Sequence, residues 1–321
     1  MIDRHLSLTF AALLFATTTV FGAYPERAIR IIVPYAPGGN IDITARTIAP
    51  SLAEGLGQQV VIDNRGGAGG TIGSEIAAKS AADGYTLLLG SSGTLSTAPP
   101  LYPKLGYDPI KDFATTSLVS TTAMVLELHP SIPVRSVKEF IALAKARPGK
   151  ITMGSPGAGT ANHLTGELFQ SATGTKLIHI PYKGSGPGLI DLMGGQIDTF
   201  FDQLAGSIGF IQTGKLRALA VTTANRAAAM PELPTIAESG IPGFDASTWA
   251  GIVLPVATPH DIVMKVHAAL IRTLRAKATR DNFARLGAET LESTPEEFAR
   301  FMRNDIAKWT KVVREAGIKL E

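Results

Sequence analysis

The sequence contains no cysteine among its 321 residues. The chain therefore has no disulfide, no cysteine nucleophile and no thiolate ligand for a metal, although this absence identifies no compartment by itself. Charged residues make up only 18% of the chain, the net charge is +3, and lysine and arginine form no dense run. We therefore expect no nucleic-acid partner; a small anionic ligand suits the mildly basic chain better.

Several motifs of catalytic and cofactor sites are also missing. No Gly-Lys-Ser/Thr follows a glycine loop, which excludes a nucleotide P-loop, and no serine stands in G-x-S-x-G. The histidines lack the spacing of a metal site, such as H-E-x-x-H. The loop at 66–73 reads G-x-G-x-x-x-G instead of G-x-G-x-x-G, which favours a structural turn over a dinucleotide site. We expect no cofactor, no metal and no catalytic residue.

Long apolar runs are scarce as well, and the clearest one is at the N-terminus. Residues 6–21 are mainly apolar, follow Arg4 and His5, and precede small residues. This run is shorter than the about 20 residues that span a bilayer, and its flanks are typical of a secretory leader. We interpret 1–23 as a signal peptide, cleaved after Gly22 or Ala23, which predicts a soluble periplasmic or secreted protein.

The most informative segment that is present is 31–46, which reads I-I-V-P-Y-A-P-G-G-N-I-D-I-T-A-R. Residues 31–33 form a buried-strand pattern, and two prolines and a glycine pair then predict a sharp turn. Helical spacing begins at Ile41, with Asn40 or Asp42 as its N-cap. A strand, a glycine turn and a helix start together present backbone N–H groups to an anion. The segment predicts binding and not chemistry.

The strand–loop–helix unit recurs along the chain, which predicts a parallel α/β architecture. We expect strands at 59–63, 85–89, 151–154, 177–180, 197–201 and 216–222, and helices at 72–79, 136–147, 161–170, 189–193, 261–277, 280–286 and 295–316. Two extended segments, 118–128 and 249–254, are expected to cross between two similar lobes. Two lobes joined by two crossings suit a ligand cleft between them.

A second glycine loop, 155–160, precedes a helix and is the expected counterpart of the first turn. His163 follows it, either as a ligand-binding or loop-orienting residue or as a satisfied buried histidine. Asp42 and Asp202 could hold a water molecule or a ligand amine or hydroxyl, act as acid or base, or simply cap a helix and end a strand. Residues 182–184, Tyr-Lys-Gly, could supply a stacking ring and a cation.

These residues lie within longer stretches that resemble the tripartite tricarboxylate transporter substrate-binding receptors, the Bug family of periplasmic solute-binding proteins. The similarity covers essentially the whole mature chain and consists of many collinear motifs. It is carried by the segments 24–46, V-V-I-D-N-R-G-G-A-G-G-T-I-G at 60–73, 101–113, S-P-G-A-G-T-A-N-H-L at 155–164, 179–198, 215–222 and 306–321.

The resemblance implies a type II periplasmic-binding-protein fold, in which two Rossmann-like α/β domains close like a flytrap around two hinge crossings. Domain 1 would be 24–122 plus 250–321, and domain 2 would be 123–249. The family implies capture of a small carboxylate for a permease with a large and a small subunit. The implied ligand-binding residues are Tyr35, Ala36, Pro37, Gly38, Gly39, Asp42, Ser91, Ser92, Gly93, Thr94, Ser155, Gly157, Gly159, Thr160, His163, Tyr182, Lys183 and Asp202.

Some alternatives stay open at this point. The ligand could be a di- or tricarboxylate, an amino acid or an aromatic acid, and Ala98 stands beside the expected pocket where the family commonly has asparagine. The receptor could report its ligand to a sensor kinase instead of feeding a permease. A secreted hydrolase that uses Asp42 or His163 is a third reading. Because a hinge-bending receptor needs both lobes free, we expect a monomer.

Overall fold

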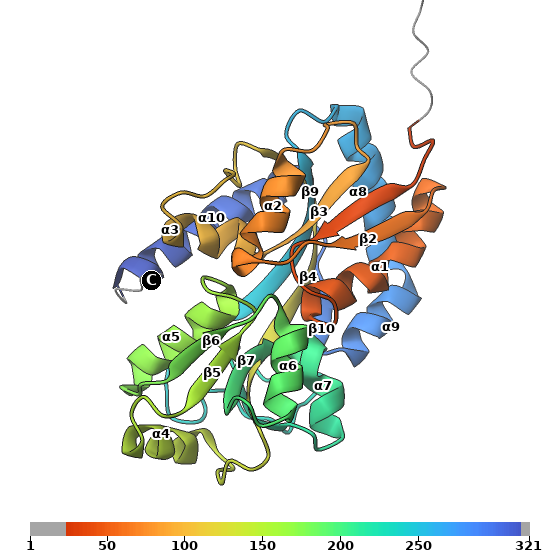
Figure 1. Ribbon diagram of the computed structural model, residues 1–321. Coiled ribbons are helices and arrows are strands. Elements are labelled where there is room, and N and C mark those ends of the chain that lie inside the picture. Colours follow the sequence, from red (N-terminus) through yellow and green to blue (C-terminus); the bar gives the residue numbers. More distant parts are fainter. Residues whose placement is uncertain (1–23, 316–321) are drawn as a thin grey trace, which may run out of the picture.

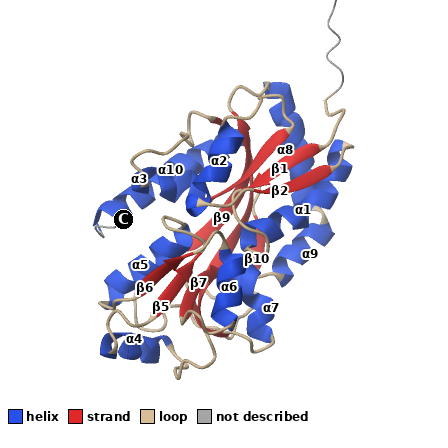
Figure 2. Cartoon of the chain, in the orientation of Figure 1, coloured by secondary structure: helices blue, strands red, loops and turns tan. Residues whose placement is uncertain are grey.

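The computed structural model describes residues 24–315. Within these residues ten strands form one sheet, in the order β2-β1-β3-β9-β4-β7-β5-β6, with β8 and β10 also paired to β4. The strands are β1 (Ile29–Val33), β2 (Val60–Asn64), β3 (Thr86–Ser91), β4 (Phe113–Leu128), β5 (Thr152–Ser155), β6 (Ile178–Pro181), β7 (Thr199–Gln203), β8 (Arg217–Val221), β9 (Ser247–Pro255) and β10 (Ala288–Thr290). Figure 2 shows these strands at the centre, with the helices outside.

The helices alternate with the strands over most of the chain. They are α1 (Asn40–Leu56), α2 (Thr71–Ala78), α3 (Ala98–Leu101), α4 (Val137–Ala146), α5 (Ala161–Thr173), α6 (Ser185–Met193), α7 (Leu204–Gln212), α8 (His260–Arg275), α9 (Lys277–Arg285) and α10 (Pro295–Glu315), with short turns η1 (Ala68–Gly70) and η2 (Gly93–Thr97). No helix within residues 24–315 is both long and apolar enough to cross a bilayer. The expected leader, 1–23, lies outside the described residues.

Strand β4 connects the two halves of the sheet. Its 16 residues pair with β9 from Phe113 to Ala123 and with β7 from Met124 onward. We call residues 24–123 and 247–315 lobe 1, and residues 124–246 lobe 2. The change of partner lies next to the boundary predicted at 122/123, and the two crossings predicted from the sequence correspond to β4 and β9 (Figure 1). Independent movement of the lobes stays a prediction.

Each lobe has its own apolar core. The central strands are covered by helices on both faces, as is usual for parallel strands. In lobe 1, β1 lies parallel between β2 and β3, and α1 and α8 pack together on it. In lobe 2, Phe140, Phe169 and Phe201 are fully buried between the sheet and the helices α4 and α5. These separate cores place the loops at the strand ends of the two lobes opposite each other.

The C-terminal helix α10 joins the lobes through a small apolar cluster. Trp309 and Val313 of α10 are buried with Leu101 of lobe 1 and Leu164 of α5 in lobe 2. The other tryptophan, Trp249, donates its indole N–H to Asp305 Oδ2 at 2.7 Å, which holds β9 to the same helix. The helix therefore belongs to lobe 1 and touches lobe 2 near its end.

Three local expectations from the sequence were wrong. The N-cap of α1 is Gly39, not Asn40 or Asp42. Asp202 lies within β7 and does not end it, and a helix that the sequence pattern missed, α7, follows directly. Its sequence L-A-G-S-I-G-F-I-Q contains two glycines and two β-branched residues, which disfavour a helix in isolation. Tertiary packing of Leu204 and Ile208 against Val125 and Val221 stabilises it instead.

The lobe 2 core gives a direct stability prediction. Replacing the fully buried Phe201 with alanine should lower the free energy of unfolding by about 3–5 kcal/mol, since it removes a ring and leaves a cavity. Chemical denaturation followed by circular dichroism measures the loss. Ile190→Ala, at a site where the side chain is 66% exposed, is the control and should change it by less than about 0.5 kcal/mol. Equal losses in both variants would contradict the assigned core.

Candidate functional site

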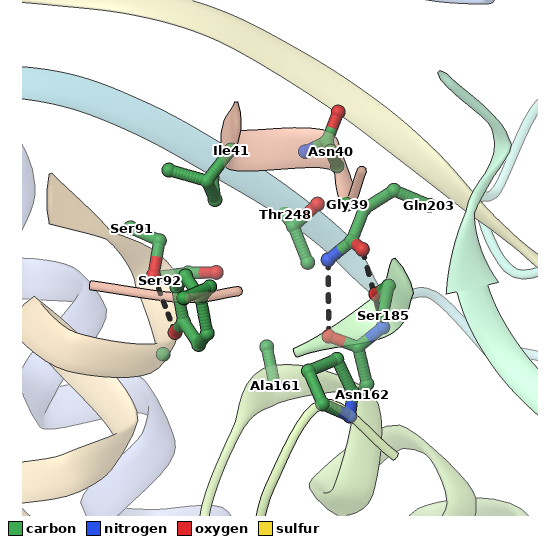
Figure 3. Close-up of a pocket in the computed structure, with 13 residues that line it drawn as sticks. Gly39, Asn40, Ile41, Ser91, Ser92, Ala161, Asn162, Ser185, Gln203 and Thr248 are labelled. Atoms are coloured by element: carbon green, nitrogen blue, oxygen red, sulfur yellow. Dashed lines mark hydrogen bonds between the residues drawn. The ribbon is translucent and has the colours of Figure 1, made fainter. Parts of the chain in front are cut away.

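A small cavity lies between the two lobes. Its lining comes from strand ends and helix starts of both lobes and consists of Tyr35, Gly39, Asn40, Ile41, Ser91, Ser92, Gly93, Pro156, Ala161, Asn162, Ser185, Gln203 and Thr248. Figure 3 shows Asn40 and Ile41 of lobe 1 across the cavity from Ala161 and Asn162 of lobe 2. None of these lining residues carries a charge, so any ion that binds there must be held by neutral groups.

Three helices begin at this cavity. The first residues of α1, α5 and α6 are Asn40, Ala161 and Ser185, and all three line it. The first N–H groups of a helix have no partner within the helix, and its dipole is positive at that end. Helix starts of both lobes therefore give this cavity an electrostatic environment that favours a negatively charged group.

Two lining side chains add polar atoms that have no hydrogen-bond partner among residues 24–315. Asn40 Oδ1 and Ser92 Oγ are buried, and neither atom has a hydrogen-bond partner within the described residues. Burying an unpaired polar atom costs about 1–3 kcal/mol, so such atoms are uncommon without a reason. Their position at the cavity wall is consistent with partners that a ligand or water molecules supply.

Asp42 holds the turn between β1 and α1 in shape. Its Oδ2 accepts from the backbone N–H of Gly38 at 3.0 Å and from Arg46 Nε at 2.9 Å, and its Oδ1 accepts from Asn64 Nδ2 at 3.0 Å. Burial opposes ionisation of the carboxyl group, but these donors outweigh burial, so the pKa of Asp42 lies below its usual value. The Gly38 φ of +86° is a left-handed conformation that favours glycine. Asp42 thus positions this turn and does not line the cavity.

The lobe 2 wall of the cavity is a hydrogen-bonded network around Asn162. Asn162 Nδ2 donates to the Phe201 carbonyl at 2.7 Å, and the Asn162 and Gln203 amides pair through Gln203 Nε2 and Asn162 Oδ1 at 3.0 Å (Figure 3). Behind this wall, Asp202 Oδ1 accepts from Ser185 Oγ at 2.5 Å and from Asn162 Nδ2 at 3.1 Å. The network fixes the direction in which each lining group faces the cavity.

Asp202 is part of a buried acidic pair. Its carboxyl group and that of Glu127 on β4 are fully buried, and Asp202 Oδ2 and both Glu127 oxygens lack a partner within the described residues. Burial raises the pKa of Asp202 to about 7. Burial, followed by the proximity of Asp202, raises the pKa of Glu127 well above its usual value. Burial and mutual repulsion thus disfavour a second negative charge behind the wall.

The loop between β5 and α5 is held by two stacked histidines. The His163 and His179 rings lie 3.7 Å apart at an angle of 11°. His163 Nδ1 accepts from the Gly159 N–H at 3.1 Å, and His179 Nε2 lies 2.6 Å from Ser155 Oγ. Thr160 caps α5 through its side chain. His163 is thus buried, and its ring accepts from the backbone of the loop.

The structure places the sequence-predicted site residues in three groups. Tyr35, Gly39, Ser91, Ser92 and Gly93 line the cavity. A second group supports the loops behind it and consists of Asp42, Thr94, Ser155, Thr160, His163 and Asp202. The third group lies where the lobes meet or beside that contact and consists of Ala36, Pro37, Gly38, Gly157, Gly159, Tyr182 and Lys183. The Tyr182 hydroxyl donates to Asp191, and neither Tyr182 nor Lys183 lines the cavity.

Eight lining residues were not among the predicted site residues. They are Asn40, Ile41, Pro156, Ala161, Asn162, Ser185, Gln203 and Thr248. Most lie inside the stretches predicted to form the pocket and were not singled out there: Asn40 and Ile41 fall within 35–42, and Pro156, Ala161 and Asn162 fall within 155–163. Ser185 lies two residues after the predicted Lys183. Gln203 and Thr248 lie in or beside strands, where the sequence gives no corresponding signal. Among residues 24–315, no cluster of three metal-binding side chains occurs.

Around the cavity, backbone carbonyls of lobe 2 accept hydrogen bonds from lobe 1. The Ala36 N–H donates to the Lys183 carbonyl at 2.9 Å, and Thr97 Oγ1 donates to the Gly159 carbonyl at 2.8 Å. A Cβ atom on Gly186 would lie only 2.2 Å from the Pro37 carbonyl oxygen. The two lobes are therefore closed on each other, and glycine permits the close approach.

The histidine stack predicts a specific pH dependence. Burial, aided by the neighbouring His163, lowers the pKa of His179 from 6.5 to about 3. Because the folded state holds His179 neutral, its contribution to stability is complete above pH 6.5 and is lost as the pH falls toward 3. His179→Gln removes this titration. The difference in unfolding free energy between wild type and variant should shrink on acidification, by at most about 1.4 kcal/mol per pH unit.

Denaturant titrations at several pH values between 7 and 4 measure this difference. A difference that stays constant across the range would show that His179 keeps the same pKa in the folded and unfolded chain.

Comparison with known proteins gives consistent matches along most of the chain. A family model described as "Tripartite tricarboxylate transporter family receptor" matches residues 44–318. The chain is 41% identical to Protein BugT of Bordetella pertussis over 299 residues, which cover 93% of this chain and 92% of that protein.

Two solved structures are similar in fold over nearly their whole length. An R. palustris protein with adipate is 37% identical, with a TM-score of 0.90 over 92% of this chain and 99% of that one. MatC from Rhodopseudomonas palustris with bound malate is 32% identical, with a TM-score of 0.87 over 90% of this chain and 100% of that one.

Proposed function

Because the chain belongs to the tripartite tricarboxylate transporter receptor family, we propose that its cavity captures a small carboxylate for delivery to a membrane permease. The family consists of periplasmic substrate-binding receptors and not enzymes, so the secreted-hydrolase reading is set aside. The observation that carries the proposal is the convergence of the α1, α5 and α6 N-termini on one uncharged cavity. The relatives with adipate and malate support a carboxylate as the ligand class.

In this proposal the carboxylate oxygens accept from the helix-start N–H groups and from the Ser92 hydroxyl. Fixed dipoles in a site that excludes water stabilise an anion without a buried counter-charge, whose desolvation would be unfavourable. The absence of charge from the lining then assists release, because no ion pair must be broken when the lobes open. The proposed partner is a permease with a large and a small subunit, and the receptor is proposed to act as a monomer.

The proposal includes the route to the periplasm. Residues 1–23 would act as a cleaved signal peptide, with cleavage after Gly22 or Ala23. Mass spectrometry of the protein purified from a periplasmic extract determines the mature N-terminus directly.

Ligand capture is testable by stability. After unfolding and refolding to remove co-purified ligand, a carboxylate that binds the native state at about a hundredfold excess over Kd should add about 2.7 kcal/mol to the unfolding free energy. Thermal shift and calorimetry against di- and tricarboxylates, amino acids and aromatic acids measure this. A ligand-free protein that no carboxylate stabilises would contradict the proposal.

Closure is testable separately at Gly186. Gly186→Ala places a methyl group against the Pro37 carbonyl, a steric conflict of roughly 1–3 kcal/mol, so the Kd should rise about tenfold or more. Small-angle scattering should show that the variant contracts less than wild type when ligand is added. The control is Gly209→Ala in α7, where an added Cβ meets nothing within 4 Å. Wild-type affinity in both variants would contradict closure as the source of binding energy.

A further inference from the structure

The hydrogen bonds behind the lobe 2 wall determine what that wall can offer to a ligand. The Phe201 carbonyl can only accept, so the group 2.7 Å from it must be the Asn162 NH₂ and not the amide oxygen. The remaining contacts of Asn162 Nδ2, to Asp202 Oδ1 and Gln203 Oε1, are also to acceptors. Both amide hydrogens are therefore used within the protein. Oδ1 already accepts from Gln203 Nε2 at 3.0 Å, so Asn162 can offer the cavity only the second lone pair of this oxygen, as an acceptor.

The Ser185 hydroxyl is committed in the same way. It donates to Asp202 Oδ1 at 2.5 Å, the oxygen that also accepts from Asn162. When Asp202 takes up a proton, the proton has a free position on Oδ2, which has no partner among the described residues. Ser185 therefore donates inward whether or not Asp202 is ionised. Its remaining lone pairs are acceptors, and Ser185 itself lines the cavity.

Asn162 and Ser185, which share the acceptor Asp202 Oδ1, thus form an acceptor wall. We propose that the ligand presents a hydrogen-bond donor, a hydroxyl or an ammonium group, to this wall, so that the site selects hydroxy- or amino-substituted carboxylates over unsubstituted ones. This inference rests on the proposed function, since the carboxylate itself is assigned to the helix-start N–H groups. A carboxylate oxygen or a bare methylene against the wall would leave the remaining lone pairs of Asn162 Oδ1 and Ser185 Oγ without a donor.

Asp202 is a positioning residue in this arrangement, because it acts through the groups that it orients. The charge of Asp202 also affects whether the wall prefers an ammonium or a hydroxyl group of the ligand. When it is ionised, its negative charge behind the wall favours an ammonium group over a hydroxyl group, whereas a neutral Asp202 treats the two more equally. A site built to pair with a polar substituent rejects the analogue that lacks it more strongly than an apolar pocket rejects an extra methylene.

A matched ligand series tests the inference. Succinate, malate and aspartate share one four-carbon skeleton and differ only in carrying hydrogen, hydroxyl or ammonium at one carbon; glutarate, 2-hydroxyglutarate and glutamate repeat the comparison one carbon longer. Calorimetry on the ligand-free wild-type protein should give at least one donor-bearing ligand a Kd about tenfold or more below that of its unsubstituted partner. Tighter binding of aspartate or glutamate would identify an ammonium group as the donor. Tighter binding of malate or 2-hydroxyglutarate would identify a hydroxyl group.

Ser185→Ala removes one acceptor at the first residue of α6, where alanine is compatible with a helix. The preference for the donor-bearing ligand over its unsubstituted partner should fall to a few-fold. Ser239→Ala is the control, since Ser239 is a serine of lobe 2 that does not line the cavity and whose hydroxyl donates to the Thr235 carbonyl at 2.8 Å, and it should keep the wild-type preference. Circular dichroism and melting temperature establish that both variants fold.

The outcomes separate the two proposals. Equal affinity of wild type for succinate, malate and aspartate, and within the five-carbon series, overturns the acceptor wall and leaves carboxylate capture intact. If the wild-type protein shows the preference and a folded Ser185→Ala variant shows it equally, the role assigned to Ser185 is overturned. Failure of every carboxylate to bind overturns both proposals. Because the wild-type series alone decides the inference, it does not depend on the folding of any variant.

Discussion

The structure depends on a contact in which backbone meets backbone. Around the cavity the lobes approach through Ala36, Pro37 and Gly38 on one side and Lys183 and Gly186 on the other, with no room for an extra methyl group at Gly186. Only this close approach brings the starts of α1 and α6 to one volume. Ser185 and Gly39 lie on opposite lobes, yet a Cβ on Gly39 would lie 3.2 Å from that of Ser185. This arrangement of helix starts is therefore a property of the closed pair of lobes.

Much of the fold could be predicted from the sequence because the strands are short apolar runs that glycine and proline end clearly. The similarity to the tripartite tricarboxylate transporter receptors and the fold that it implied are confirmed, and the segments around β1, β3 and α4 were close to their observed bounds. Helix α7 could not be predicted, since its glycines and β-branched residues form a helix only when packed against Val125 and Val221.

The site was predictable in outline and not in its contacts. The sequence indicated the glycine loops, because loops before helix starts have a recognisable composition, and Tyr35, Ser91 and Ser92 do line the cavity. It could not show that Asn162 and Gln203, which are distant in sequence, pair as amides, or that Asp202 lies behind them. Whether a side chain offers the cavity a donor or an acceptor depends on which of its hydrogens already bind within the protein. Only the three-dimensional contacts contain that information.

Helix α10 has a further consequence for how the protein can be observed. Its Trp309 packs against Leu164 across the lobe boundary, and Trp249 donates to Asp305 of the same helix within lobe 1. The chain contains two tryptophans in all. One indole thus lies at the contact between the lobes, whereas the other lies within lobe 1. On the proposed opening of the lobes, Trp309 would lose its contact with Leu164, so the intrinsic emission of the unlabelled protein would carry an optical signal of closure.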